Sequence, residues 1–266
     1  MSKPLTFLLL ALVGVAGPAH FPPAARAADI VCITSEDPDN YDAVNFLEGF
    51  KERELLPAGH RVTILVGNQP KPTHFEGLVP AVRAADLLIV FVRRATPPQE
   101  QLDAIRGHLR AGRPLIGIRT ANHGFIASQN APPPPSCATW PEFTPEVLGC
   151  QNAGYETKGL PYTVARHPDV PADEPLLAGV DVDSIRGHQS LYLVLPLAAD
   201  ARPLLVGTAK DREPPQPVAW TRIHPGEGRS KIFYTSLGAP QDVVGPAVRR
   251  LLVNAVNWAL AGTPQP

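Results

Sequence analysis

The stretch Arg113–Phe125 reads RPLIGIRTANHGF, a short apolar run that ends after a glycine and breaks into a polar turn. A helix-like segment from Pro97 to Gly112 precedes it, so the local order is helix, strand, exposed turn. This order is typical of a buried parallel strand that carries side chains to a site at its carboxyl end. The turn holds four polar side chains within five residues: Arg119, Thr120, Asn122 and His123.

The turn lacks a nucleophile. In a nucleophile elbow, the residue two positions after Gly117 would be Ser or Cys, and here it is Arg119. A guanidinium cannot attack a carbonyl, but it can hold an oxyanion or a sugar hydroxyl. The alternative is structural: Arg119 would pair with Glu36 or Asp37 and join the first and fourth loops.

Three more strands precede this one. They are expected over Asp29–Thr34, Arg61–Val66 and Asp86–Val92, and helices with apolar stripes separate them. This alternation predicts βαβ units, and right-handed crossovers bring the carboxyl ends of the strands to one edge of a parallel sheet. Four loops should meet there, after residues 34, 66, 92 and 118.

The second half of the chain has a different pattern. Residues 128–161 show no period, which is typical of a lid or a binding loop. Strands are expected over 190–195, 204–208, 217–222 and 231–235, with a hairpin turn at Pro225–Gly228 and a closing helix over Val243–Leu260. We therefore expect one domain over 28–262 and a short tail over 263–266.

Residues 1–27 resemble a secretory signal peptide. Lys3 precedes an apolar run over Leu5–Ala16, and small residues surround the expected cleavage site after Ala27. We expect an exported protein, periplasmic or secreted, and no later run approaches the length of a membrane span. Without this segment the chain has 22 basic and 25 acidic residues, a net charge of −3, which argues against a nucleic-acid partner.

The three cysteines are Cys32, Cys137 and Cys150. In an oxidising compartment Cys137 and Cys150 could form a disulfide across the proline-rich loop. Three unpaired thiols are the equal alternative.

Several segments resemble the trehalose-utilisation (ThuA-like) family. They are DLLIVFVRRATPPQEQLDAI, PLIGIRTANHGF, WPEFTPEVLGC, HPDVPADEPLLAGV and PVAWTRIHPGEGRSKIFYTSLG with its trailing VRRLLVNAVNWAL. The resemblance implies an α/β fold of the class I glutamine amidotransferase type, a flavodoxin-like three-layer sandwich with a mainly parallel sheet. It also implies carbohydrate metabolism, with a sugar or 3-keto-sugar ligand, and no amidotransferase cysteine.

The chain departs from these relatives in two loops. Cys150–Tyr155 stands where they carry a histidine-containing run, and Ala239 follows Gly238 where a histidine is common. Both changes weaken a metal or acid/base role for those loops.

The candidate site combines the polar residues of the converging loops. We assign catalytic roles to Arg119, His123 and Glu36, and substrate-binding roles to Asp37, Arg93, Arg94, Thr120, Asn122, Tyr155, His188 and Ser236. Structural alternatives stay open: Asp37 as the cap of the turn before Pro38, only one of Arg93 and Arg94 facing the site, and His188 at a surface position.

No cofactor is predicted. The eight histidines lack the spacing of metal ligands, although a divalent metal held by distant residues such as His123 and His188 stays open. The expected partner is a small carbohydrate, and a homo-oligomer is left open. Two functions follow: a sugar isomerase, lyase or hydrolase, which is not a glutamine amidotransferase, or a non-catalytic carbohydrate-binding module.

Overall fold

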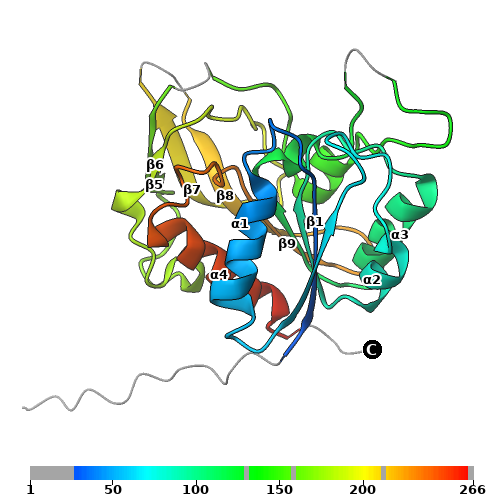
Figure 1. The fold of residues 1–266 in the computed structure, drawn as a ribbon. Helices are drawn as coiled ribbons and strands as arrows, with labels where there is room; N and C mark the ends of the chain where they lie inside the picture. The colour runs from blue at the N-terminus through cyan, green and yellow to red at the C-terminus, as the bar shows by residue number, and fades with distance from the viewer. Residues whose placement is uncertain (1–26, 129–131, 157–159, 211–213, 263–266) are drawn as a thin grey trace, which may run out of the picture.

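The computed structural model describes residues 27–128, 132–156, 160–210 and 214–262. The expected signal peptide, apart from Ala27, and the expected tail lie outside this part of the chain. The described residues contain one nine-stranded sheet in the order β2-β1-β3-β4-β9-β8-β7-β5-β6 (Figure 1). The strands are β1 (Asp29–Thr34), β2 (Arg61–Val66), β3 (Leu87–Phe91), β4 (Leu115–Ile118), β5 (Tyr162–Arg166), β6 (Arg186–Gly187), β7 (Arg202–Ala209), β8 (Gln216–Ile223) and β9 (Lys231–Thr235).

One half of the sheet is parallel. Strands β2, β1, β3, β4 and β9 pair in register, for example Cys32 with Ile64 and Ile116 with Phe233. The sequence of β3 is LLIVF, and all five residues are buried. A strand that is apolar on both faces needs cover on both, which is why helices flank this half.

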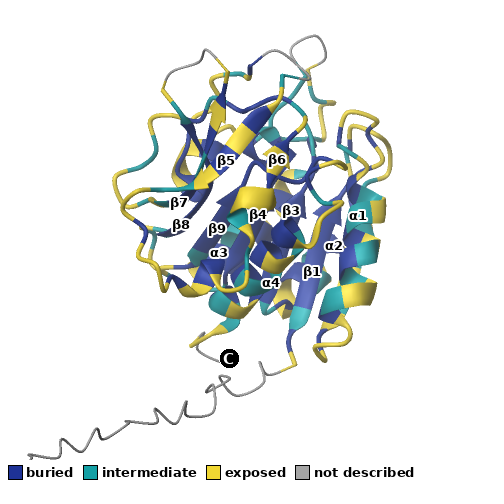
Figure 2. Ribbon diagram, turned by 90° about the vertical axis from the view of Figure 1, so that its left-hand side faces the viewer, coloured by how far each residue is buried: buried dark blue, intermediate teal, exposed yellow. Residues whose placement is uncertain are grey.

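The helices form a layer on each face. Helices α1 (Ala43–Phe50) and α4 (Pro246–Leu260) pack on one face, while α2 (Leu78–Ala84) and α3 (Gln99–Arg110) pack on the other. Alternate residues of β1 enter the two cores, Ile30 and Cys32 on one side and Val31 and Ile33 on the other. Figure 2 shows the buried strands behind helices whose outer surfaces are exposed.

The other half of the sheet is antiparallel. Strand β9 pairs antiparallel with β8, and the antiparallel pairing continues from β8 to β7, from β7 to β5 and from β5 to β6. The expectation of a mainly parallel sheet is therefore wrong, and the sheet is mixed. The expected turn at Pro225–Gly228 does connect β8 to β9, where Arg229 N donates to Gly226 O at 2.9 Å.

One expected strand is absent and two were missed. Residues 190–195 lie outside the sheet because their backbone pairs with the segment 151–156: Leu193 N donates to Gly154 O at 3.0 Å, and Ala153 N donates to Leu193 O at 3.1 Å. Strands β5 and β6 carry weak signals, since β5 (YTVAR) has no continuous apolar run and β6 has only two residues. Figure 2 shows buried and exposed residues alternating along β5.

The long loop is anchored by aromatic residues. Phe143, at the start of a π-helical turn η3 (Phe143–Leu148), meets Phe125 edge to face at 4.9 Å between ring centroids and Trp140 at 5.2 Å. Cys32, Cys137 and Cys150 are all free, which corresponds to the alternative of three unpaired thiols. None of the described helices is long and apolar enough to cross a bilayer.

Candidate functional site

The loops after β1, β3, β4 and β9 meet at the carboxyl edge of the parallel half, near the top of Figure 1. The side chain of Asn40 links the ends of β1 and β3 and the loop after β4 through hydrogen bonds. Its Nδ2 donates to Phe91 O at 3.0 Å and to Ser35 O at 3.3 Å, and its Oδ1 accepts from Thr120 Oγ1 at 2.5 Å. We call this region the carboxyl-edge site.

Arg119 is the buried centre of the site. It follows β4 directly, has a φ of 43°, and its exposed fraction is 0%. Its Nη1 donates to Ser236 O at 2.6 Å and its Nη2 to Ser190 O at 3.4 Å. Its guanidinium carbon lies 4.0 Å from the ring centroid of Tyr41 and 4.9 Å from that of Tyr192.

The acidic partner of Arg119 is Asp242, and neither Glu36 nor Asp37 takes that place. Asp242 Oδ2 lies 3.9 Å from Arg119 Nη1, and both side chains are fully buried. The carboxylate also accepts from the backbone amides of Gly238 at 3.2 Å and Ala239 at 3.1 Å. Burial alone would lower the pKa of Arg119, but the surrounding tyrosines and Asp242 raise it above its ordinary value. A substrate could reach this guanidinium only if the loops opened.

The two arginines after β3 have different surroundings. Arg93 binds Asp37 at 3.0 Å and Asp39 at 3.3 Å, so its donors are used within the protein. Arg94 has a φ of 52°, and its Nη1 donates to Ala127 O at 2.9 Å. No carboxylate of the described residues lies within 4.0 Å of the Arg94 guanidinium, so its charge is not paired within this part of the chain, and its side chain is partly buried.

His123 is half-buried beside these arginines. Its Nδ1 shares a short hydrogen bond with Asn122 Oδ1, and its ring lies 5.9 Å from that of Tyr192. Burial, followed by the charges of Arg94, Arg93 and Arg119, lowers the pKa of His123 to about 3. The imidazole is therefore neutral at neutral pH, and it acts there as a hydrogen-bonding group.

The remaining candidates occupy the rim and the floor of the site. Tyr155 is 63% exposed and pairs with Tyr192 in an isolated bridge. Glu36 and His188 are exposed, and the His188 backbone amide donates to Asp242 Oδ1 at 3.3 Å. Asp37 accepts from Asp39 N at 2.9 Å, so it does cap its turn as well as pairing with Arg93.

Some buried polar atoms of the site have no hydrogen-bond partner within the described chain. They include Ser35 Oγ, Asn122 Nδ2 and Ser236 Oγ, at the ends of β1, β4 and β9. Unpaired buried groups cost free energy and are usually satisfied by ordered water. Within the described residues no group of three or more His, Cys, Asp or Glu side chains is arranged to hold a metal ion.

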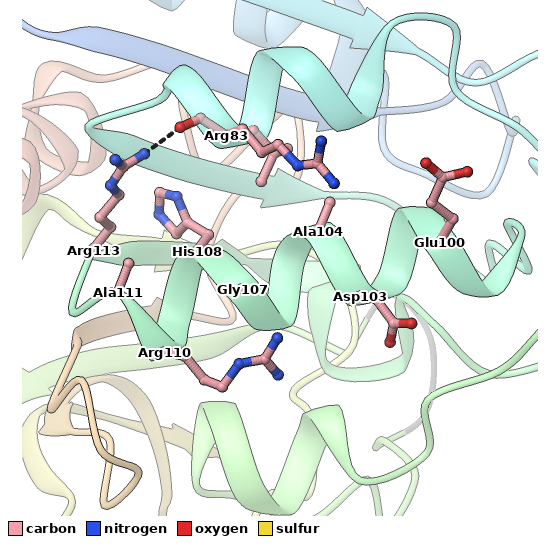
Figure 3. A pocket seen from close by; sticks show the side chains of 10 residues that line it. Arg83, Glu100, Asp103, Ala104, Gly107, His108, Arg110, Ala111 and Arg113 are labelled. Carbon is pink, nitrogen blue, oxygen red and sulfur yellow. Dashed lines mark hydrogen bonds between the residues drawn. The ribbon is translucent and has the colours of Figure 1, made fainter.

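A pocket of about 610 Å³ lies elsewhere, between α2 and α3 (Figure 3). Arg83, Arg110 and Arg113 line the end near the amino ends of β3 and β4, and Arg113 Nη1 donates to Ala85 O at 3.0 Å. These arginines stand at the ends of the two helices, where cations complement the helix dipole. None of the residues that line this pocket belongs to the carboxyl-edge site.

Sequence reasoning missed four residues that build the site: Asn40, Tyr41, Tyr192 and Asp242. Tyr41 and Tyr192 resemble ordinary core aromatics in sequence. Asp242 gave a weak signal, since an acid four residues after Gly238 can cap the turn that leaves β9.

Two solved structures share this arrangement of elements. A putative ThuA-like protein from Bacteroides uniformis superimposes with a TM-score of 0.61 and 16% identity, over 92% of this chain and 96% of that one. A putative ThuA-like protein from Parabacteroides merdae gives 0.59 and 14%, over 91% and 92%. The chain has a ThuA-like fold.

The ThuA-like fold does not by itself assign a function. The mmIFT52 N-terminal domain also aligns, with a TM-score of 0.50 and 11% identity, over 89% of this chain and 100% of that one. Neither a family model nor a curated protein sequence matches this chain. Function must therefore be argued from the carboxyl-edge site.

Proposed function

We propose that this ThuA-like protein is exported and binds a sugar or keto-sugar at the carboxyl-edge site, as part of carbohydrate catabolism. The observation that carries the proposal is the grouping of Arg94, His123 and Tyr155. The backbone amide of Arg94 donates to His123 O at 3.1 Å, and the ring of His123 lies 5.9 Å from that of Tyr192. Tyr192 pairs with Tyr155 in an isolated bridge, so the three residues lie around one part of the site. They offer a cation, a neutral imidazole and an exposed aromatic ring to one ligand.

The strand order supports this position. The parallel half runs β2-β1-β3-β4-β9, which is the order of flavodoxin-like sheets. In such sheets ligands bind where the order reverses, between β1 and β3. The loops that leave these two strands carry Glu36, Asp37, Arg93 and Arg94, so the flavodoxin-like interpretation and the ligand site support each other.

The chemistry of the side chains suits a sugar. An exposed tyrosine ring offers apolar area to the C–H face of a pyranose, and its hydroxyl offers a polar tip. Arg94 and His123 add hydrogen-bonding groups that fit hydroxyl or carbonyl oxygens. Tyr155 is 63% exposed, so a ligand can reach its ring without any movement of the loops.

If the site is catalytic, its side chains would act by general acid–base catalysis on the bound sugar. Arg119 stands at the elbow position, so acyl-enzyme chemistry is disfavoured. The neutral His123 and the exposed Glu36 are then the groups that could accept or donate a proton. This would suit an isomerase, a lyase or a hydrolase.

The second candidate is a non-catalytic carbohydrate-binding module. The burial of Arg119 favours it, because the residue at the elbow is engaged with Ser236, Ser190 and Asp242 within the fold. On this proposal the loops still bind a sugar, but they carry out no reaction.

The test combines binding and turnover. The full-length mature protein is titrated with disaccharides and 3-keto-disaccharides, with and without divalent metal, and products are followed. Tyr155→Ala should weaken binding, while Arg110→Ala on α3 serves as the matched surface control. Failure of every sugar to bind would reject the proposal; binding without conversion under any metal condition would leave the binding module. Amino-terminal sequencing of exported protein tests the cleavage after Ala27.

A further inference from the structure

The three arginines of the carboxyl-edge site differ in how far the protein neutralises them. Arg119 has Asp242 and two backbone carbonyls, and Arg93 has two aspartates. Arg94 has only the carbonyl of Ala127. Among the described residues of this site, Arg94 is the arginine without an ion pair to a carboxylate.

Arg94 is also held in a fixed position. Its backbone amide donates to His123 O at 3.1 Å, and the amide of the next residue, Ala95, donates to Gly124 O at 2.6 Å. These bonds join the end of β3 to the turn after β4. The guanidinium is thus placed by the scaffold, and it does not hang from a free surface loop.

The surroundings of Arg94 disfavour a second cation and favour an anion. The side chain is partly buried, and both this burial and the nearby Arg93 lower the pKa of Arg94. Asp37 offsets part of this repulsion, but its carboxylate is bound to Arg93 at 3.0 Å. A partly desolvated guanidinium without a carboxylate partner gains most from an anion supplied by a ligand.

We propose that Arg94 binds a carboxylate on the ligand, so that the preferred ligand is a sugar acid of the uronate or aldonate class and not a neutral sugar. The planar guanidinium matches the two oxygens of a carboxylate. Tyr155 would lie against the sugar ring, and the neutral His123 would contact a hydroxyl. This inference rests on the proposed function and specifies its ligand.

Pairs of ligands that differ mainly in a carboxylate separate the effect of ligand charge on affinity from the effect of ligand shape. The mature protein is titrated calorimetrically with glucose and glucuronate, and with cellobiose and cellobionate. Each acid should bind at least about tenfold more tightly than its neutral partner, because a charge-assisted hydrogen bond is gained. The preference should fall as salt rises.

Substitutions of Arg94 then test whether this residue supplies the positive charge that binds the acid. Arg94→Gln keeps a donor for Ala127 O but should abolish the preference for the acid, and Arg94→Lys should retain part of it. Arg110→Gln on α3 removes an exposed arginine elsewhere and should leave the preference intact. Thermal melts of each variant verify that it is folded.

The outcomes distinguish this inference from the proposed function. If glucose binds as tightly as glucuronate, or if the preference survives Arg94→Gln, the inference is overturned while sugar binding stands. If acetate alone binds as tightly as glucuronate, the sugar contributes nothing and the sugar-acid assignment is overturned. If no sugar or sugar acid binds, both the inference and the proposed function fail.

Discussion

At the scale of the residue, Arg119 illustrates how a side chain can resemble a substrate clamp in sequence and yet be internal. Its neighbours in sequence are polar and follow a strand, as in a binding turn. Its partners Ser190, Ser236 and Asp242 all come from much later in the chain. No local pattern around residue 119 encodes these contacts, so the sequence could place Arg119 at the edge of the sheet but could not predict its burial.

Arg119→Lys should therefore destabilise the protein by about 3 kcal/mol. A lysine lacks the planar guanidinium that contacts the rings of Tyr41 and Tyr192, and it leaves Asp242 poorly paired. Urea denaturation measures the change. Arg93→Lys, at a half-buried ion pair, is the control and should cost less than about 1 kcal/mol. Equal stability of Arg119→Lys and the wild type would show that the buried guanidinium has no structural role.

His108 should make the protein sensitive to acid. Burial lowers the pKa of His108 from 6.5 to about 4. Between these values the unfolded chain binds a proton that the folded chain does not, so stability is full above pH 6.5 and is lost as the pH falls toward 4. The slope from this residue is at most about 1.4 kcal/mol per pH unit.

Urea midpoints measured from pH 7 to pH 4.5 check this expectation. His108→Gln should flatten the acid limb, and His188→Gln, at an exposed position, should leave it unchanged. His123 contributes in the same direction, since its pKa is also lowered, so part of the slope should remain. An unaltered slope in His108→Gln would contradict the assignment.

At the scale of the element, the parallel strands and the hairpin partners β7 and β8 could be predicted, whereas β5, β6 and the pairing of residues 190–195 could not. Strands β1, β2 and β9 occur at the predicted residues because each is an uninterrupted β-rich run that ends at a turn. The run LYLVLP over 191–196 is equally apolar, yet it pairs with a loop segment. Apolar character predicts burial, but the partner of a backbone depends on distant residues.

The contact between α3 and the β8–β9 turn depends on a glycine. A Cβ on Gly228 would come within 2.5 Å of Arg110 O and still closer to Leu109 O and Gly112 N, and all three are backbone atoms that cannot rotate away. Gly228→Ala should destabilise the protein by about 3 kcal/mol, because the turn must move off the end of the helix.

Gly107→Ala is the matched control in α3. Its nearest atom would be Arg110 Nη2 at 3.8 Å, an ordinary contact, and alanine favours the helix. This substitution should raise stability by about 0.5–1 kcal/mol. Thermal and urea unfolding of both variants measure the opposite signs; a neutral Gly228→Ala would mean that the helix and the turn are not tightly packed.

At the scale of the whole molecule, one sheet joins the parallel and antiparallel halves, and each of its two cores includes residues of both. The first core contains Leu47 of α1 and Val218 of β8, and the second contains Val90 of β3 and Trp220 of β8. We expect a single cooperative unfolding transition. Tryptophan fluorescence and far-ultraviolet circular dichroism should give coincident midpoints, and two separated transitions would show that the halves are independent.

During translation, Arg119 is synthesised long before the groups that bind its guanidinium in the folded protein. These groups are the backbone carbonyls of Ser190 and Ser236 and the carboxylate of Asp242. A nascent chain that has emerged only through β4 contains a guanidinium that cannot be buried at acceptable cost. We therefore expect the parallel half to close only after the segments that contain Ser190, Ser236 and Asp242 have been synthesised. On our proposal that residues 1–27 direct export, the same delay would keep the precursor unfolded for translocation.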